Sequence, residues 1–256
     1  MMGAHHAVTG AAAWCAVSCT VPGALGLTPT GPDGVLIGAI TCAGAALLPD
    51  ADHPHATIAR SVPLFGRAGA NAVNGLSGGH RHGTHSLVSV PIVFLLASLL
   101  QHAAAEVPWW HQTVWWGPGL ATAALVAFAS KSMRMLRSWP NAWTLGAVCG
   151  GLVAFLAPAW PGWVPLSITL GFVVHLAGDF LTVGGLPLLW PFNPKPPRLL
   201  RRSRLASRLW RRNGYFALPL LGKTGSPREW ALATIVSVYT VYLVVAQLMT
   251  GGAAAA

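Results

Sequence analysis

The sequence predicts an all-α fold, a polytopic helical membrane protein with about five to seven transmembrane helices. Of its 256 residues, 54% are hydrophobic and only 9% are charged, whereas roughly one quarter of the residues in soluble domains are charged. Several apolar stretches approach the roughly 17–25 residues that a helix needs to cross the hydrocarbon layer. The formal net charge of +10 is distributed unevenly between these stretches. Composition, segment length and charge asymmetry together exclude an ordinary soluble domain.

Apolar stretches that could span the membrane occur along most of the chain. Two of them are rich in Ala and Gly, and a turn at residues 22–32 would join them into a tight helical hairpin; they are residues 7–21 and 34–48. The other five set the lower end of the predicted range: residues 86–100, 113–129, 142–157, 164–181 and 231–249.

The distribution of Lys and Arg predicts an orientation, because these residues are enriched in cytoplasmic loops. Lys131, Arg134 and Arg137 follow the stretch that ends at residue 129, so this end is expected inside. The next two spans return the chain to the same side. The loop 49–85 and the N-terminus then also fall inside, and the tryptophan-rich loop around Glu106 falls outside.

Charge and hydropathy divide the chain into three predicted regions: residues 1–192, embedded in the membrane, residues 193–222, basic and cytoplasmic, and residues 223–256, a C-terminal transmembrane helix with its tail. The basic segment has eight Lys and Arg residues and no acidic one. We interpret it as a loop that touches anionic lipid, partly as an amphipathic helix, in preference to a nucleic-acid site.

Two aspartates and a histidine follow the stretch 34–48. Asp50, Asp52 and His53 offer the oxygen and nitrogen donors that zinc or manganese accepts. Ionisable groups at the end of a span are costly and usually functional. We therefore predict a metal site here; the alternative is a polar turn that leaves the membrane.

A second polar cluster directly precedes the next apolar stretch. His80, His82 and His85 lie within six residues, and His82 and His85 are close enough to converge on one point. Arg81 offers a planar fork for a phosphate or carboxylate oxygen, and Thr84 can cap the following helix. A pH-sensing loop or an accidental chelator would show the same histidines.

A third cluster lies within the stretch 164–181. His175 and Asp179 are four residues apart and so project from the same face of a helix. Both can approach one metal ion, or one can orient the other. Gly178 permits the close approach of a neighbouring helix. A buried pair that satisfies only itself is the alternative.

His5 and His6 precede the first apolar stretch and are candidates to complete the metal shell; of the two, we include His5 in the predicted ligand set. A loosely ordered terminus is the alternative.

The orientation derived from charge places all four polar clusters at the same membrane face. If each cluster had only the alternative explanation given for it, nothing would require the four to share one face. Three aspartates also supply about the charge needed at a two-metal hydrolytic site.

The motifs at residues 48–54, 79–86 and 175–182 resemble those of the YdjM-type membrane proteins. That family is described as LexA-binding and inner-membrane-associated, and a metal-dependent hydrolase activity is inferred for it. The resemblance extends to about residue 192 and implies that residues 1–192 form a hydrolase-like domain. Its implied site residues are Asp50, Asp52, His53, His80, His85, His175 and Asp179. His82 stands where the family often carries Gly.

The leading hypothesis is a membrane-bound metal-dependent hydrolase of the inner (plasma) membrane, with its metal site facing the cytoplasm and a phosphoester or lipid-like substrate. The expected cofactor is a divalent metal, zinc or alternatively manganese. The predicted ligands are His5, Asp50, Asp52, His53, His80, His85, His175 and Asp179. We assign catalytic roles to Asp52, Arg81 and Asp179, and substrate contacts to Arg81, Thr84 and Thr182.

Two other classes of function remain open from the sequence. One is a metal or proton carrier, which would be expected to distribute ionisable residues through the depth of the bilayer. The other is a membrane tether with a structural metal site that binds a regulator protein. The expected partners are membrane lipid, an anionic or phosphate-bearing substrate and a regulator, whereas nucleic acid is not favoured.

Overall fold

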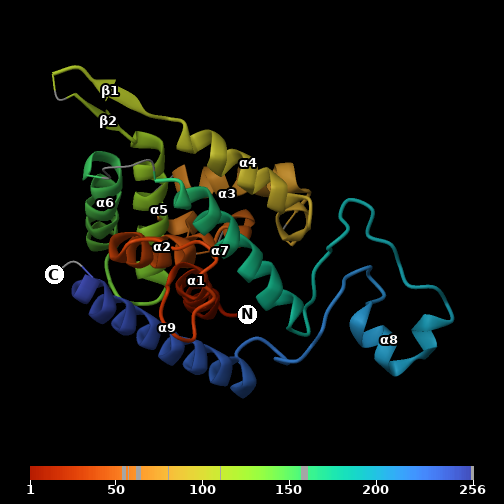
Figure 1. Cartoon of the computed structure of the whole chain (residues 1–256). Helices are drawn as coiled ribbons and strands as arrows, with labels where there is room; N and C mark the ends of the chain where they lie inside the picture. The colour runs from red at the N-terminus through yellow and green to blue at the C-terminus, as the bar shows by residue number, and fades with distance from the viewer. Residues whose placement is uncertain are drawn as a thin grey trace.

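The computed structural model describes residues 1–53, 56, 58–61, 65–79, 81–109, 111–156 and 161–254. They form an α-helical bundle with one short antiparallel β-hairpin (Figure 1). The α-helices are α1 (Gly3–Ser18), α2 (Pro32–Ala45), α3 (Phe65–Ser77), α4 (Ser89–Gln101), α5 (Trp116–Ser132), α6 (Trp139–Leu156), α7 (Trp163–Phe180), α8 (Arg204–Leu209) and α9 (Pro227–Ala254). Four 3-10 helices, η1 (Pro49–Asp52), η2 (Ile58–Arg60), η3 (Gly83–His85) and η4 (Leu200–Arg202), and the strands β1 (Ala105–Val107) and β2 (Gln112–Val114) complete it.

Helix α2 lies in the middle of the bundle, where glycines bring its backbone close to those of its neighbours. A Cβ atom at Gly44 would lie 2.0 Å from the carbonyl oxygen of Leu125 in α5. A Cβ atom at Gly171 in α7 would lie 2.3 Å from the carbonyl oxygen of Cys42 in α2. Small residues at such contacts are typical of helices that pack within a membrane, where close packing replaces the hydrophobic drive of water. This packing fixes α7 against the end of α2.

Two buried apolar clusters join the helices. The first is built from small and branched residues of α1, α2, α5 and α7, among them Ala7, Leu125 and Ile168. The second surrounds Trp14, whose indole nitrogen donates to the carbonyl oxygen of Gly34 at 3.0 Å. Leu243 of α9 belongs to this second cluster, so α9 is attached to the bundle along α1.

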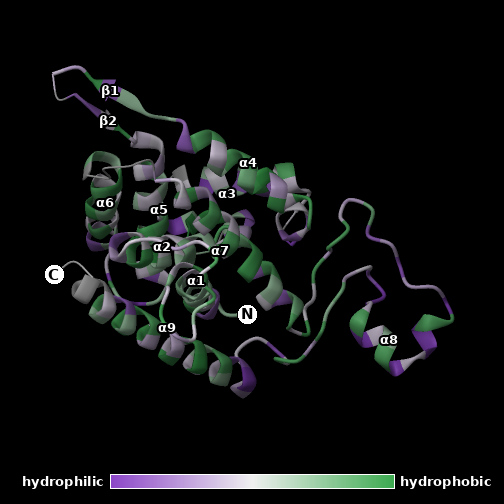
Figure 2. Ribbon diagram, viewed as in Figure 1, coloured by the Kyte–Doolittle hydropathy of each residue, from purple (hydrophilic) through white to green (hydrophobic). Residues whose placement is uncertain are grey.

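Three segments of the described chain are long and apolar enough to cross a membrane. They are Pro32–Asp52, Trp163–Phe180 and Pro227–Thr250. The all-helical membrane fold predicted from sequence is thus confirmed, but the predicted number of five to seven spans is not. Helix α9 is the most exposed of the three, because only 17% of its most apolar stretch is buried. Much of its ribbon has the colour of hydrophobic residues in Figure 2.

Several predicted spans are shorter in the structure than in the sequence. The stretch 86–100 yields α4, which begins at Ser89 and has 13 residues, or about 20 Å of helix at 1.5 Å per residue. The stretch 113–129 begins in strand β2, because the chain turns through the β-hairpin before α5 starts at Trp116. The stretch 7–21 ends as helix at Ser18. Hydropathy alone assigned the residues at the ends of these stretches to the spans, whereas in the structure they form the turns and the strand next to the helices.

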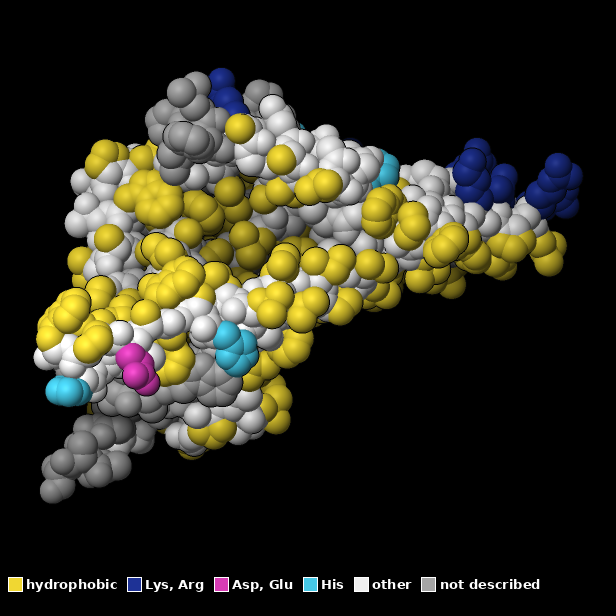
Figure 3. Space-filling view, turned by 90° about the horizontal axis from the view of Figure 1, so that it is seen from above, with side chains coloured by type: hydrophobic (Ala, Val, Ile, Leu, Met, Phe, Trp, Pro, Cys, Tyr) yellow, Lys and Arg dark blue, Asp and Glu magenta, His cyan; other side chains and the backbone are white. Residues whose placement is uncertain are grey.

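The basic segment forms an arm that projects from the bundle and carries η4 and α8 (Figure 1). Seen from above, Lys and Arg side chains gather along one side of this arm and hydrophobic side chains along the other (Figure 3). Leu199 and Leu205 are 79% and 67% exposed. The expected amphipathic character is present, although α8 itself has only six residues.

Candidate metal centre

Helix α7 supplies the first two side chains of the candidate site. His175 and Asp179 are both buried and lie one turn apart on the same helix face. Nδ1 of His175 lies 2.7 Å from the carbonyl oxygen of Ala46, at the end of α2. A carbonyl can only accept a hydrogen bond, so Nδ1 carries the proton and Nε2 keeps its lone pair. His175 is therefore held in the tautomer that a metal ligand requires.

His85 meets His175 from the loop between α3 and α4. Its Nε2 atom lies 3.3 Å from Nε2 of His175 and 3.5 Å from Oδ1 of Asp50. Asp50 Oδ1 is also 3.9 Å from Nε2 of His175. Two imidazoles that bind tetrahedral zinc at about 2.0–2.1 Å place their nitrogen atoms about 3.3 Å apart. The three groups thus have the spacing of ligands around one ion.

Asp179 joins this group and links it to α1. Its Oδ2 atom is 4.0 Å from Nε2 of His85 and 3.9 Å from Nε2 of His175. Its Oδ1 atom lies 3.1 Å from Nε2 of His6 and also contacts the backbone nitrogen of Met1. Oδ2 is buried and forms an ion pair with the guanidinium of Arg81. We call His6, Asp50, His85, His175 and Asp179 the histidine–aspartate cluster.

His6 reaches the cluster because α7 carries a glycine opposite it. A Cβ atom at Gly178 would lie 3.0 Å from Cε1 of His6. The ring of His6 stacks on that of His175, with ring centroids 3.8 Å apart. The neighbouring helix that Gly178 was predicted to admit is therefore α1, and the side chain that fills the space is His6.

His5, which the sequence-based ligand set included in place of His6, points to a different part of the molecule. Its Nδ1 atom lies 2.6 Å from Oε1 of the buried Glu229, at the start of α9. Successive residues on a helix point about 100° apart, so His5 and His6 cannot face the same neighbour. Glu229 is an acidic residue that the sequence reasoning did not assign to any site.

Asp52 lies behind the cluster and holds the loop that carries His85. Its Oδ2 atom accepts hydrogen bonds from the backbone nitrogen of Arg81, at 3.0 Å, and from the hydroxyl of Thr84, at 2.6 Å. The same hydroxyl lies 3.0 Å from Nδ1 of His85. Asp52 therefore faces the Nδ1 side of His85, opposite the Nε2 atom that meets His175. The geometry makes Asp52 and Thr84 positioning residues, whereas the sequence placed Asp52 among the ligands and Thr84 at the substrate.

Arg81 reaches over the cluster from a strained backbone position. Its φ angle is 59°, in the left-handed region, and its Nη2 atom lies 2.9 Å from Oδ2 of Asp179. The hydroxyl of Tyr215 donates to the carbonyl oxygen of Arg81 at 3.1 Å, and partial burial raises the pKa of Tyr215. Gly184 leaves room for the guanidinium, since a Cβ atom there would lie 2.8 Å from Nη1.

The cluster is open to the outside on one side. The side chains of Asp50 and Arg81 are 31% and 32% exposed, while those of His85, His175 and Asp179 are exposed by 1% or less. A small ion or an anionic group can therefore approach past Asp50 and Arg81. The carboxylates and imidazoles behind them form a donor set that suits a divalent metal such as zinc.

Two other predicted site residues lie elsewhere, and a third is not among the described residues. The hydroxyl of Thr182 donates to the carbonyl oxygen of Asp179 at 2.8 Å and caps the end of α7, so it does not face the opening. His53 ends η1, with its backbone nitrogen bonded to the carbonyl oxygen of Asp50, and its side chain is not among the described groups that could share an ion. His80 lies outside the described residues.

The protein has apolar helices long enough to span a membrane, and its histidine–aspartate cluster is buried at one end of the bundle. These features define an integral membrane protein with a candidate metal centre. The model of the family described as YdjM inner membrane protein matches residues 1–137 and 120–253. The chain therefore belongs to the YdjM family, and the resemblance seen in its motifs is confirmed. No curated protein and no solved structure matches it.

Proposed function

We propose that this protein is a membrane-bound, metal-dependent hydrolase that acts on a phosphoester at the membrane surface. The observation that carries the proposal is the convergence of Asp50, His85, His175 and Asp179, from three separate segments, with His175 fixed in the ligand tautomer. Oδ2 of Asp179 is paired with Arg81 at 2.9 Å and also lies 4.0 and 3.9 Å from Nε2 of His85 and of His175. Because a carboxylate oxygen has more than one lone pair, a cation between these groups could share this oxygen with Arg81.

The shared position of His175 favours one ion over two. His175 is close to Asp50 and His85 on one side and to His6 and Asp179 on the other. Because Nδ1 is already bonded to Ala46, only the single lone pair of Nε2 is free for a metal. We therefore assign one zinc ion to Asp50, His85, His175 and Asp179. In this arrangement His6 orients Asp179 by donating to its Oδ1 atom.

The remaining groups fit the hydrolysis of an anionic substrate. A divalent ion at this position would act as a Lewis acid and supply a strong water-derived nucleophile at neutral pH. Arg81 stands at the exposed side of the cluster, where its fork of donors suits a phosphate group. Asp52 and Thr84 hold His85 in place while Arg81 binds the substrate.

We place the cluster at the cytoplasmic face of the inner membrane. The excess of Lys and Arg in residues 193–222 and 131–137 supports this orientation. The arm that carries α8 would rest on anionic lipid, with its exposed leucines toward the apolar layer. It would concentrate phosphate-bearing substrates near the opening.

The test combines metal analysis with hydrolysis of a panel of phosphoesters, including lipid phosphates. The wild type should contain about one zinc per chain, and His85→Ala and His175→Ala should lose most of it. His111→Ala is the matched control, since His111 lies in the exposed turn between β1 and β2. Activity should fall with a chelator and return with added zinc.

Two outcomes would contradict the proposal in different ways. Unchanged zinc content in both cluster variants would exclude the metal centre itself. If the cluster binds zinc but no phosphoester is hydrolysed, the result would favour a membrane tether with a structural metal site. The partner of such a tether would then be sought at the exposed basic arm.

A further inference from the structure

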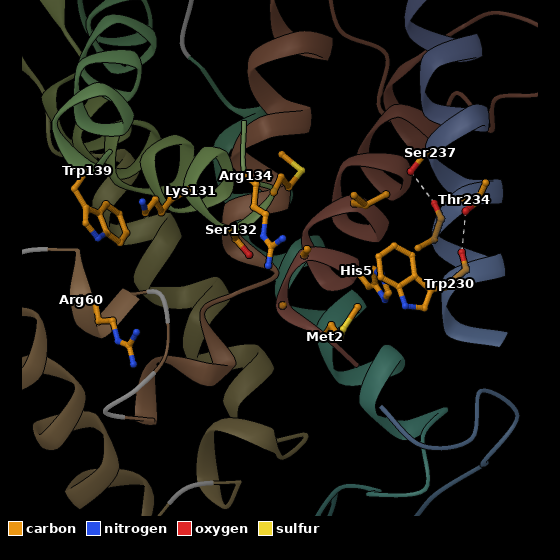
Figure 4. Close-up of a pocket in the computed structure, with 15 residues that line it drawn as sticks. Met2, His5, Arg60, Lys131, Ser132, Arg134, Trp139, Trp230, Thr234 and Ser237 are labelled. Atoms are coloured by element: carbon orange, nitrogen blue, oxygen red, sulfur yellow. Dashed lines mark hydrogen bonds between the residues drawn. The ribbon is translucent and has the colours of Figure 1, made fainter. Parts of the chain in front are cut away.

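A pocket of about 750 Å³ lies beside the N-terminal end of α1 (Figure 4). Its walls come from α1, from the turn after α5, from η2 and from the first turns of α9. None of its lining residues belongs to the histidine–aspartate cluster. Its volume is within the range of about 300–1,000 Å³ that is usual for ligand pockets.

Three cationic side chains line this pocket. Arg60 comes from η2, Lys131 from the last turn of α5, and Arg134 from the turn that follows. No ion pair between described residues joins any of them to a carboxylate. Lys131 donates to the carbonyl oxygen of Arg137 and lies over the ring of Trp139, while Arg60 and Arg134 are exposed. Like charges gathered without counterions favour the binding of an anion.

A buried, oriented histidine faces the pocket from the opposite wall. His5 is 4% exposed, and its Nδ1 atom is held by Glu229 at 2.6 Å. Its Nε2 atom is buried without a hydrogen-bond partner among the described residues. Since His5 lines the pocket, a ligand there can supply the missing partner.

Apolar side chains of α1 and α9 line the part of the pocket away from the cations. Helix α9 is a candidate membrane span and is mostly exposed, so we expect it to face lipid. Val8 of α1 and Ala233 of α9 line it, and Ser237 turns its hydroxyl back to the carbonyl oxygen of Ala233 at 2.7 Å. Trp139 and Trp230 flank the pocket, as tryptophans do at the level of lipid headgroups. The pocket thus combines cations at one end with an apolar groove that opens toward the bilayer.

We infer that this pocket binds one anionic glycerophospholipid, which remains bound and is not the substrate of the cluster. Its phosphate would pair with Arg60, Lys131 and Arg134. A polar atom of its headgroup would meet Nε2 of His5, and an acyl chain would follow the groove between α1 and α9. A free anion would use the cations but leave the groove empty, which is why the lipid is favoured.

The experiment measures lipid binding to the purified full chain by native mass spectrometry in detergent, without any assay of hydrolysis. One molecule of phosphatidylglycerol should remain bound per chain, at least about tenfold more tightly than phosphatidylcholine. The double variant Arg60→Gln/Arg134→Gln should lose at least about tenfold in affinity. Arg67→Gln/Arg228→Gln, which removes the same charge from two exposed positions that do not line the pocket, should keep the wild-type affinity.

Three results would overturn the inference. Equal binding of phosphatidylcholine would exclude recognition of an anion. Equal losses in the two double variants would show a general attraction to positive charge. Displacement of the lipid by inorganic phosphate at equal concentration would show a site for a free anion. Because zinc content is not part of the readout, each of these results leaves the proposed hydrolase untouched.

Discussion

One backbone contact decides how His175 can act. The carbonyl oxygen of Ala46 fixes the proton on Nδ1 and turns the lone pair of Nε2 toward His85 and Asp50. The same principle holds for His85, whose Nδ1 atom faces Thr84, which is in turn bonded to Asp52. Groups that orient a ligand in this way are part of a metal site even though they do not touch the ion.

Thr84→Val tests this role at the scale of the residue. Valine has nearly the shape of threonine but cannot bridge Asp52 and His85, so we expect zinc affinity to fall about tenfold or more. Competition with a chromophoric chelator measures the affinity. Thr144→Val is the control, since the hydroxyl of Thr144 donates to the carbonyl oxygen of Pro140 within its own helix, α6. Equal affinity in the two variants would show that Thr84 does not position His85.

At the scale of the element, the site depends on how closely the helices approach. His175 can reach Ala46 only because Gly171 lets α7 lie against the backbone of α2, and His6 can reach Asp179 only because Gly178 leaves space for it. Helix α2 is likewise held against α5 through Gly44. A metal centre assembled between helices inherits its precision from these backbone contacts.

Gly44→Ala should therefore destabilise the bundle. The added methyl group would fall 2.0 Å from the carbonyl oxygen of Leu125, a backbone atom that cannot move aside without shifting α5. We expect a loss of about 1–3 kcal/mol or more in the free energy of unfolding, measured by denaturant titration in detergent.

Gly151→Ala in α6 is the matched control for this helix contact. A Cβ atom at Gly151 meets no heavy atom within 4 Å, so the substitution should be neutral or stabilise the helix by up to about 1 kcal/mol. If both variants unfolded at the same denaturant concentration, the close contact between α2 and α5 would be refuted.

At the scale of the whole molecule, the charge distribution predicts how the protein is oriented in the membrane. The basic arm, the turn after α5 and the loop that carries His85 are all expected on the cytoplasmic side, with the β-hairpin on the other. Three segments meet the length and hydropathy of a span, and the shorter helices pack around them.

Labelling of single cysteines can test this orientation. In a variant without the four native cysteines, Gly69→Cys in α3 and Ser203→Cys before α8 should react with an impermeant maleimide only from the cytoplasmic side. Glu106→Cys in strand β1 should react only from the outside. All three positions are exposed. Labelling of Ser203→Cys in intact spheroplasts would reverse the proposed orientation.

The sequence by itself determined the membrane class and the family, because hydropathy and short polar motifs are local properties of the chain. His85, His175, Asp50 and Asp179 were predicted as site residues from their types, their spacing and their positions at the ends of apolar stretches, and the structure brings them close together. Only the tertiary structure decided between His5 and His6, since that choice depends on which face of α1 meets α7 and which meets α9. It also decided that Asp52 and Thr84 stand behind His85, that Tyr215 and Gly184 contact Arg81, and that Glu229 holds His5, because these contacts join residues far apart in the chain.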